Sequence, residues 1–139
     1  MIEVSSETVL NYNRKTNTLV IVVSGSPEST AEIEKSVSNW IEAIEEAVSI
    51  AGTKIWLILD IRDLEIPSFR TVPKDNELKG VFSKNVFDLV GVVSSTNQRL
   101  KMKLMFLFMA KGSAVVEYVT DAEEVISKQQ EKFGVFPPL

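Results

Sequence analysis

Acidic, basic and hydroxyl side chains gather in residues 55–70 of the chain, which read IWLILDIRDLEIPSFR. Asp60 and Asp63 lie at the end of a nearly continuous apolar run, which is typical of a buried strand. Open α/β sheets bind ligands beyond the carboxyl ends of their strands, so both carboxylates are candidates for a ligand site. Alternatively, Asp60 accepts backbone hydrogen bonds at the sheet edge and Asp63 is a solvated loop charge. Oxygen-only cation sites need several converging ligands, and no second carboxylate cluster supplies them.

Ser68 lies in the same stretch, directly after Pro67, and is a candidate for phosphorylation. A phosphate there would add about two negative charges, which could pair with Arg62 or Arg70. The alternative is that Ser68 caps a helix or a turn, which is the commoner use of such a serine.

Histidine and cysteine are both absent from the 139 residues. Their absence excludes disulfides, thiolate catalysis, Ser-His-Asp triads and nearly every zinc site. The six glycines are too scattered to form a phosphate-binding loop or a dinucleotide motif. An enzyme using only carboxylates and serine would need a base within reach of its nucleophile, and no such pair is visible. We therefore expect no catalytic residue, no metal and no cofactor.

The composition is that of one globular domain, with 45% hydrophobic residues and a net charge of −4. The mild acidity argues against nucleic acid as a partner. No basic start followed by an apolar run indicates a secretory signal, and the longest apolar run, residues 104–110, is too short to span a membrane. We expect a cytoplasmic protein without stable membrane insertion.

Strand-like and helix-like segments alternate along the chain. Residues 4–12 and 19–24 flank a turn and predict a β-hairpin. Apolar residues at steps of three and four predict a long helix that ends at Gly52. Further strands are predicted at 55–61, 86–94 and 114–119, and further helices from about Lys74, over 96–111 and from about Thr120. This order predicts a single α/β domain with parallel crossovers.

The segment 96–111, TNQRLKMKLMFLFMAK, is apolar on nearly all sides of a helix. Leu100, Leu104 and Leu107 are the expected contribution to the core. Methionine adapts to varied surfaces, so the other apolar residues are expected to form a dimer interface or an apolar ligand groove. These residues are Met102, Met105, Phe106 and Met109. Alternatively, residues 105–109, MFLFM, form a buried strand and not part of a helix.

Two motifs, ILDIRDLE at 58–65 and VEYVTDAEE at 116–124, give the chain its likeness to a known family. With the order of elements, they resemble the STAS superfamily, and more closely its SpoIIAA-like branch. The resemblance implies a bacterial regulatory domain of the kind found in anti-sigma-factor antagonists. Such proteins bind a kinase and are switched by phosphorylation within an Asp-Ser-Ser/Thr-Gly motif. Residues 66–70 here read IPSFR, so Ser68 matches that switch by location only.

We therefore expect one STAS-like domain over residues 1–139: a mixed sheet of about five strands with an N-terminal β-hairpin and about four helices mainly on one face. The expected function is a non-enzymatic regulatory domain that binds an unidentified protein and forms a homodimer. The alternative is a carrier or sensor of a small apolar or lipid-like ligand. Its pocket would be lined by Trp56, Phe87, Met105 and Phe108.

Overall fold

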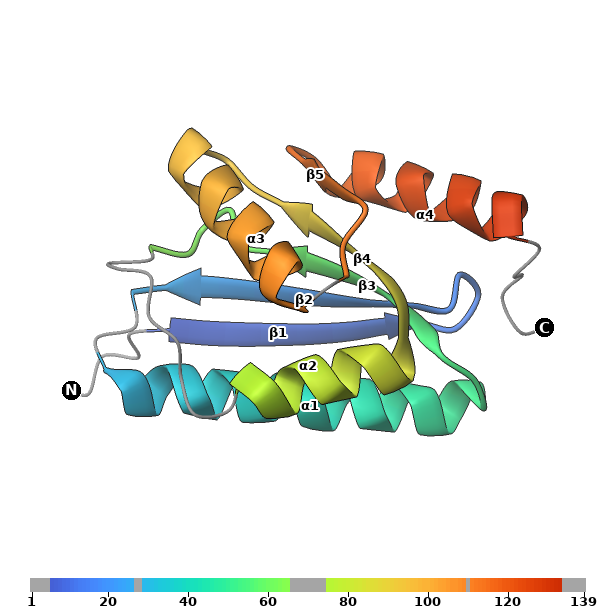
Figure 1. Ribbon diagram of the computed structural model, residues 1–139, viewed down its shortest axis with the longest axis horizontal. Helices are drawn as coiled ribbons and strands as arrows, with labels where there is room; N and C mark the ends of the chain where they lie inside the picture. The colour runs from blue at the N-terminus through green and yellow to red at the C-terminus, as the bar shows by residue number, and fades with distance from the viewer. Residues whose placement is uncertain (1–5, 27–28, 66–74, 110, 134–139) are drawn as a thin grey trace.

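The computed structural model describes residues 6–26, 29–65, 75–109 and 111–133, which form a five-stranded mixed sheet and four helices (Figure 1). The strands lie in chain order, with β1 antiparallel to β2 and every later pair parallel. The elements are β1 (Ser6–Asn13), β2 (Thr18–Gly25), α1 (Thr30–Ala51), β3 (Ile55–Asp60), α2 (Asp75–Asn85), β4 (Val86–Val92), α3 (Thr96–Met109), β5 (Ala114–Val116) and α4 (Val119–Phe133). The predicted fold class is confirmed.

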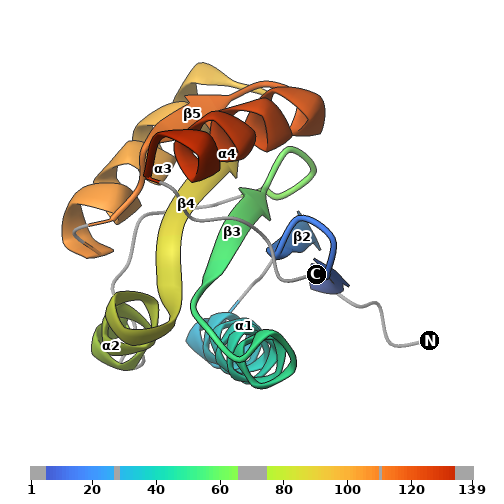
Figure 2. The same ribbon diagram turned by 90° about the vertical axis from the view of Figure 1, so that its right-hand side faces the viewer.

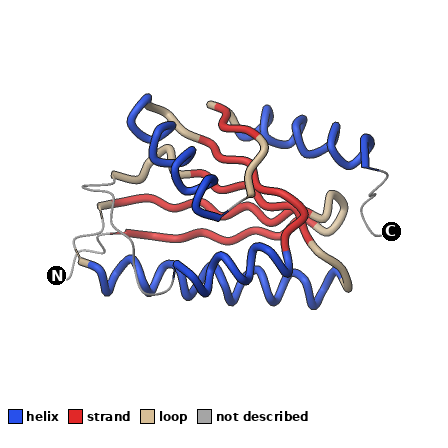
Figure 3. The backbone as a smooth tube through the Cα atoms, in the orientation of Figure 1, coloured by secondary structure: helices blue, strands red, loops and turns tan. Residues whose placement is uncertain are grey.

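The strands run side by side as one layer (Figure 3), and alternate residues of each strand face opposite sides. Leu57 and Leu59 of β3 join the core beneath α1, α2 and α3, whereas Trp56 and Ile58 join a second core beneath α4. In Figure 2, α4 lies on one side of the sheet and α1 and α2 on the other. Three helices therefore share one face, as expected, and β3 is buried throughout because both of its faces are covered.

The hairpin turn is anchored by Asn17, which is buried and has a left-handed φ of 51° that asparagine tolerates. Its side-chain nitrogen Nδ2 donates to the Lys54 carbonyl at 2.9 Å, and its side-chain oxygen Oδ1 accepts from the Tyr12 hydroxyl at 2.6 Å. Gln130 of α4 donates to the Thr16 carbonyl at 2.8 Å. The turn between β1 and β2 is thus tied both to the start of β3 and to α4.

The long helix α1 ends at Gly52, as predicted, and its first turn is capped by Ser29. The Ser29 hydroxyl accepts from the backbone N–H of Glu32 at 3.3 Å, which caps the first turn. Gly52 closes the helix at a φ of 71°, where its N–H donates to the Val48 carbonyl at 2.8 Å.

The expected faces of α3 are inverted. Residues 96–109 are a helix and not a strand, but Met102 and Met109 are 2% and 4% exposed, whereas Leu100 and Leu107 are 58% and 78% exposed. Met105 and Phe106 also pack against the core. Met102 and Met109 therefore cannot contribute to the predicted interface or groove, because they fill the space between helix and sheet. For Met105 and Phe106, which are only partly buried, that role stays a prediction.

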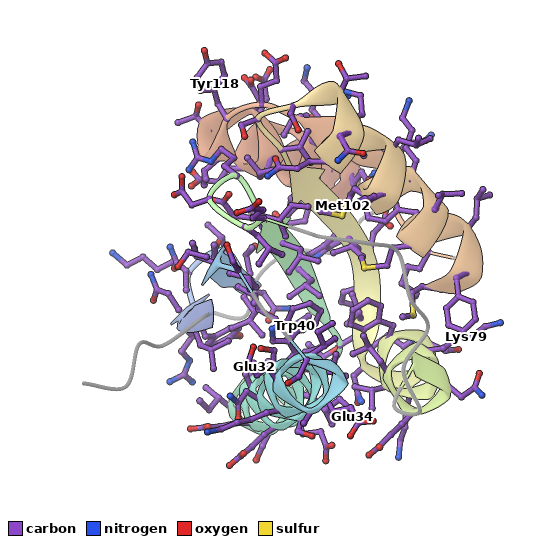
Figure 4. The ribbon with its side chains drawn as sticks, turned by 90° about the vertical axis from the view of Figure 1, so that its left-hand side faces the viewer. Glu32, Glu34, Trp40, Lys79, Met102 and Tyr118 are labelled. Atoms are coloured by element: carbon purple, nitrogen blue, oxygen red, sulfur yellow. The ribbon has the colours of Figure 1, made fainter. Side chains whose placement is uncertain are left out.

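A glycine in β4 explains why Met102 can approach so closely. A Cβ atom built on Gly91 would lie 2.6 Å from the Met102 Cγ, too close for a normal contact. Figure 4 shows Met102 lying between α3 and β4. Only a residue without a side chain leaves room for the methionine at this crossing.

Candidate functional site

The carboxyl ends of β2, β3 and β4 meet at one end of the sheet, where the turn 61–65 follows β3. The N–H of Gly25 donates to the Asp63 carbonyl at 3.0 Å, and the N–H of Glu65 donates to the Gly25 carbonyl at 2.8 Å. Gly25 has a φ of 95°, which favours glycine at this position. The Ser26 hydroxyl adds a bond to the Glu65 carboxylate at 2.9 Å. The end of β2 thus holds one side of the turn.

Gln98, in the first turn of α3, holds the other side. Its side-chain nitrogen lies within hydrogen-bond distance of three carbonyls, those of Ile61, Arg62 and Leu64, at 2.8, 3.2 and 2.9 Å. Its side-chain oxygen accepts from the N–H of Ser94 at 2.8 Å and lies 3.1 Å from the Ser94 hydroxyl oxygen. Gln98 therefore joins the turn after β3 to the turn after β4.

Sequence reasoning did not identify Gln98, although a signal for it exists. Ser95 precedes α3, and its hydroxyl accepts from the Gln98 N–H at 3.1 Å. A serine followed three residues later by glutamine is the pattern of a capping box. That pattern indicates a helix start, but it does not indicate that the glutamine side chain reaches a second loop.

Asp60 is buried, and both of its oxygens are occupied by Arg62. The Arg62 backbone N–H, Nε and a terminal nitrogen donate to the carboxylate at 3.1, 3.0 and 2.8 Å. The hydrogen bonds to the Asp60 carboxylate raise the pKa of the Arg62 guanidinium above its ordinary value. The arrangement favours the interpretation of Asp60 as a backbone-bonded group at the strand end.

Asp63 is exposed, and it lines an open hollow of about 510 Å³ between the turn 61–65 and the start of α3. The hollow is lined by two cationic, two anionic and four uncharged residues: Arg62, Lys101, Asp63, Glu65, Leu64, Ser95, Asn97 and Gln98. Because positive and negative side chains lie together in this hollow, it is better matched to a partner surface with charges of both signs than to a single small ion.

The other predicted site residues that the structure describes lie on α3 and do not line this hollow: Met102, Met105, Phe106 and Met109. Ser68 lies outside the described residues. Among the residues that the structure describes, no group of three or more acidic side chains is placed to hold a metal ion. No helix in the described ranges is long and apolar enough to cross a membrane.

The predicted ligand pocket is not formed. Trp56 and Phe87 pack together beneath α4, with ring centroids 5.2 Å apart. Met105 packs on the opposite face of the sheet. These side chains cannot line one cavity, because the sheet separates them.

Comparison with known proteins identifies a related fold. No family model and no curated protein sequence matches the chain. The crystal structure of an anti-sigma factor antagonist from Mycobacterium paratuberculosis is similar, with a TM-score of 0.51 and 15% sequence identity. The match covers 88% of this chain and 95% of that one. The likeness confirms the resemblance at the level of the fold: the chain has the STAS-like fold of an anti-sigma factor antagonist.

Proposed function

We propose that this chain is a non-enzymatic regulatory domain that binds a protein partner at the carboxyl end of its sheet. The observation that carries the proposal is the turn 61–65, which is held by Gly25 on one side and by Gln98 on the other. A turn held in this way presents its side chains in one arrangement, so little conformational freedom is lost on binding. The likeness to an anti-sigma factor antagonist supports a regulatory role.

The hydroxyl groups near the turn support binding over catalysis. The Ser94 hydroxyl donates to the Arg62 carbonyl at 3.0 Å, and the Ser95 hydroxyl caps α3. The Ser26 hydroxyl bonds to an exposed carboxylate, that of Glu65. A carboxylate left exposed to water is a weak base, and the whole chain contains no histidine that could serve instead.

Charge reversal at Asp63 tests the proposed surface. Partners would be captured by crosslinking in a lysate of the organism that encodes the chain and then identified by mass spectrometry. We expect Asp63→Lys to reduce capture of the main partner by about tenfold, as a loss of about 1.4 kcal/mol would. Glu131→Lys makes the same kind of substitution at an exposed position near the end of α4 and serves as the matched control. Equal capture by both variants would place the partner elsewhere.

Phosphorylation of Ser68 stays part of the proposal as a means of regulating the same partner. It rests on the location of Ser68 after β3 and on the resemblance to proteins that carry such a switch. Ser68→Asp is expected to leave the circular dichroism spectrum unchanged and to alter capture of the partner. A variant that unfolds would contradict an accessible switch. The homodimer and the cytoplasmic location also stay predictions.

The alternative function, a carrier of a small apolar ligand, has weaker support. Its expected pocket would require Trp56 and Met105 on the same side of the sheet, and they lie on opposite sides. Native mass spectrometry that detected a bound apolar molecule would favour it.

A further inference from the structure

The outward face of α3 carries a continuous apolar stripe. Leu100, Leu104, Leu107 and Phe108 are spaced so that they share one side of the helix, and all four are exposed. We call these four residues the α3 stripe. Contiguous exposed apolar surface on a small domain marks a site of contact with another molecule.

The charge around the α3 stripe restricts what can cover it. The charged residues of α3 are Arg99, Lys101 and Lys103, and the helix contains no acidic residue. Two α3 stripes packed against each other would bring two sets of like charges together, which opposes a symmetric pair. The complementary surface must therefore combine apolar and acidic side chains.

The chain itself has a surface with this chemistry. A hollow of about 370 Å³ lies between β1 and α1, and Leu10 and Ile50 line it with exposed apolar side chains. Glu42 and Glu46 line the same hollow, and both are exposed. We call this hollow the β1–α1 groove; none of the described residues that line it is basic.

The α3 stripe and the β1–α1 groove cannot meet within one chain. In Figures 2 and 4, α3 and β1 lie at opposite edges of the molecule: α3 packs near β5, and β1 is the strand at the far edge of the sheet. The same separation prevents one partner copy from contacting both surfaces reciprocally. An association through them would therefore be head to tail, would extend beyond two copies and would take the place of the predicted homodimer.

We propose that the α3 stripe of one copy docks in the β1–α1 groove of a second copy. The apolar side chains of the stripe cover those of the groove, while Lys103 faces the carboxylates of Glu42 and Glu46. This inference does not depend on the proposed function, because neither surface includes the turn 61–65.

Two variants that each disable one surface test the proposal by sedimentation velocity. The stripe variant is Lys103→Glu with Leu107→Glu, and the groove variant is Glu42→Lys with Glu46→Lys; all four positions are exposed. The wild-type chain should gain average mass with concentration without stopping at a dimer. Each variant alone should self-associate at least about tenfold more weakly, the change that about 1.4 kcal/mol produces.

Mixing the variants gives the decisive measurement. The stripe variant retains its groove and the groove variant retains its stripe, so a 1:1 mixture should form two-chain complexes and no larger species. Salt at 1 M should weaken the wild-type association, because it shortens the screening length to about 3 Å. Circular dichroism checks that each variant folds. If a double variant does not, the single changes Leu107→Ser and Glu46→Lys replace it.

Several results would overturn the proposal. A wild-type chain that stays monomeric at all concentrations would overturn it. So would a dimer that does not grow with concentration and that forms equally well in the groove variant. Failure of the mixture to form two-chain complexes would exclude contact between the two surfaces. Binding to anionic phospholipid vesicles that the stripe variant abolishes, with self-association unchanged, would assign the stripe to a lipid surface instead.

Discussion

Gln98 connects two loops that are far apart in sequence, and its side chain bonds to backbone groups of both. Gln98→Ala is expected to lower the free energy of unfolding by about 2 kcal/mol, because the Leu64 carbonyl loses this donor and the Ser94 N–H loses this acceptor. Gln98→Glu should cost a similar amount, since a carboxylate cannot donate to the Leu64 carbonyl. The neighbouring exposed residue provides a control: Asn97→Ala should change stability by less than about 0.5 kcal/mol in urea unfolding. Equal losses of stability at both positions would contradict the role of Gln98 in joining the two turns.

Tyr12 provides a second test at the residue scale, with a defined dependence on pH. Burial raises the pKa of the Tyr12 hydroxyl above 10.0, and the nearby charge of Arg14 opposes this shift only in part. Because the pKa of Tyr12 is higher in the folded state, the neutral phenol contributes its full share of the folding stability below pH 10.0. That contribution is lost as the pH rises through the folded-state pKa.

Tyr12→Phe should therefore cost about 1 kcal/mol at neutral pH, where the phenol donates to the buried Asn17. The difference between wild type and variant should shrink above pH 10.0. Denaturant unfolding at neutral pH and at a pH above 10.0 measures this difference in stability. Tyr118→Phe, at an exposed position, is the control. A difference that grows with pH would contradict the assigned shift.

At the scale of the element, α3 has one face toward the core and a second apolar face toward its surroundings. Met102→Lys should lower the free energy of unfolding by about 3 kcal/mol or more, because it removes a buried side chain and places a charge in the core. Leu100→Lys should change it by less than about 0.5 kcal/mol, since Leu100 is exposed. If Leu100→Lys were instead the more destabilising change, Leu100 and not Met102 would face the core, as the sequence predicted.

At the scale of the whole molecule, the absence of two residue types limits which ligands can stabilise the fold. The chain contains neither histidine nor cysteine, the preferred ligands of zinc. We expect stoichiometric zinc to leave the melting temperature unchanged, with magnesium as a second cation for comparison. A rise of several degrees would show a metal site built from oxygen ligands alone.

Local sequence patterns determined most of the elements. The continuous apolar run of β3 predicts a strand covered on both faces, and it is buried throughout. The apolar steps of α1 and the glycine after it predict a helix that ends at Gly52, as observed. These features depend on backbone conformation and on contacts between near neighbours, which residue spacing records directly.

The orientation of α3 was decided only by the tertiary structure. Leu100, Leu104 and Leu107 are separated by steps of four and three, and Met102, Met105 and Met109 by steps of three and four. Both sets therefore predict a core face equally well. Contacts with distant segments select the second set: Gln98 reaches the carbonyls of the turn 61–65, and Gly91 leaves room for Met102. Periodicity describes one helix alone, whereas the buried face depends on which neighbouring surface fits it.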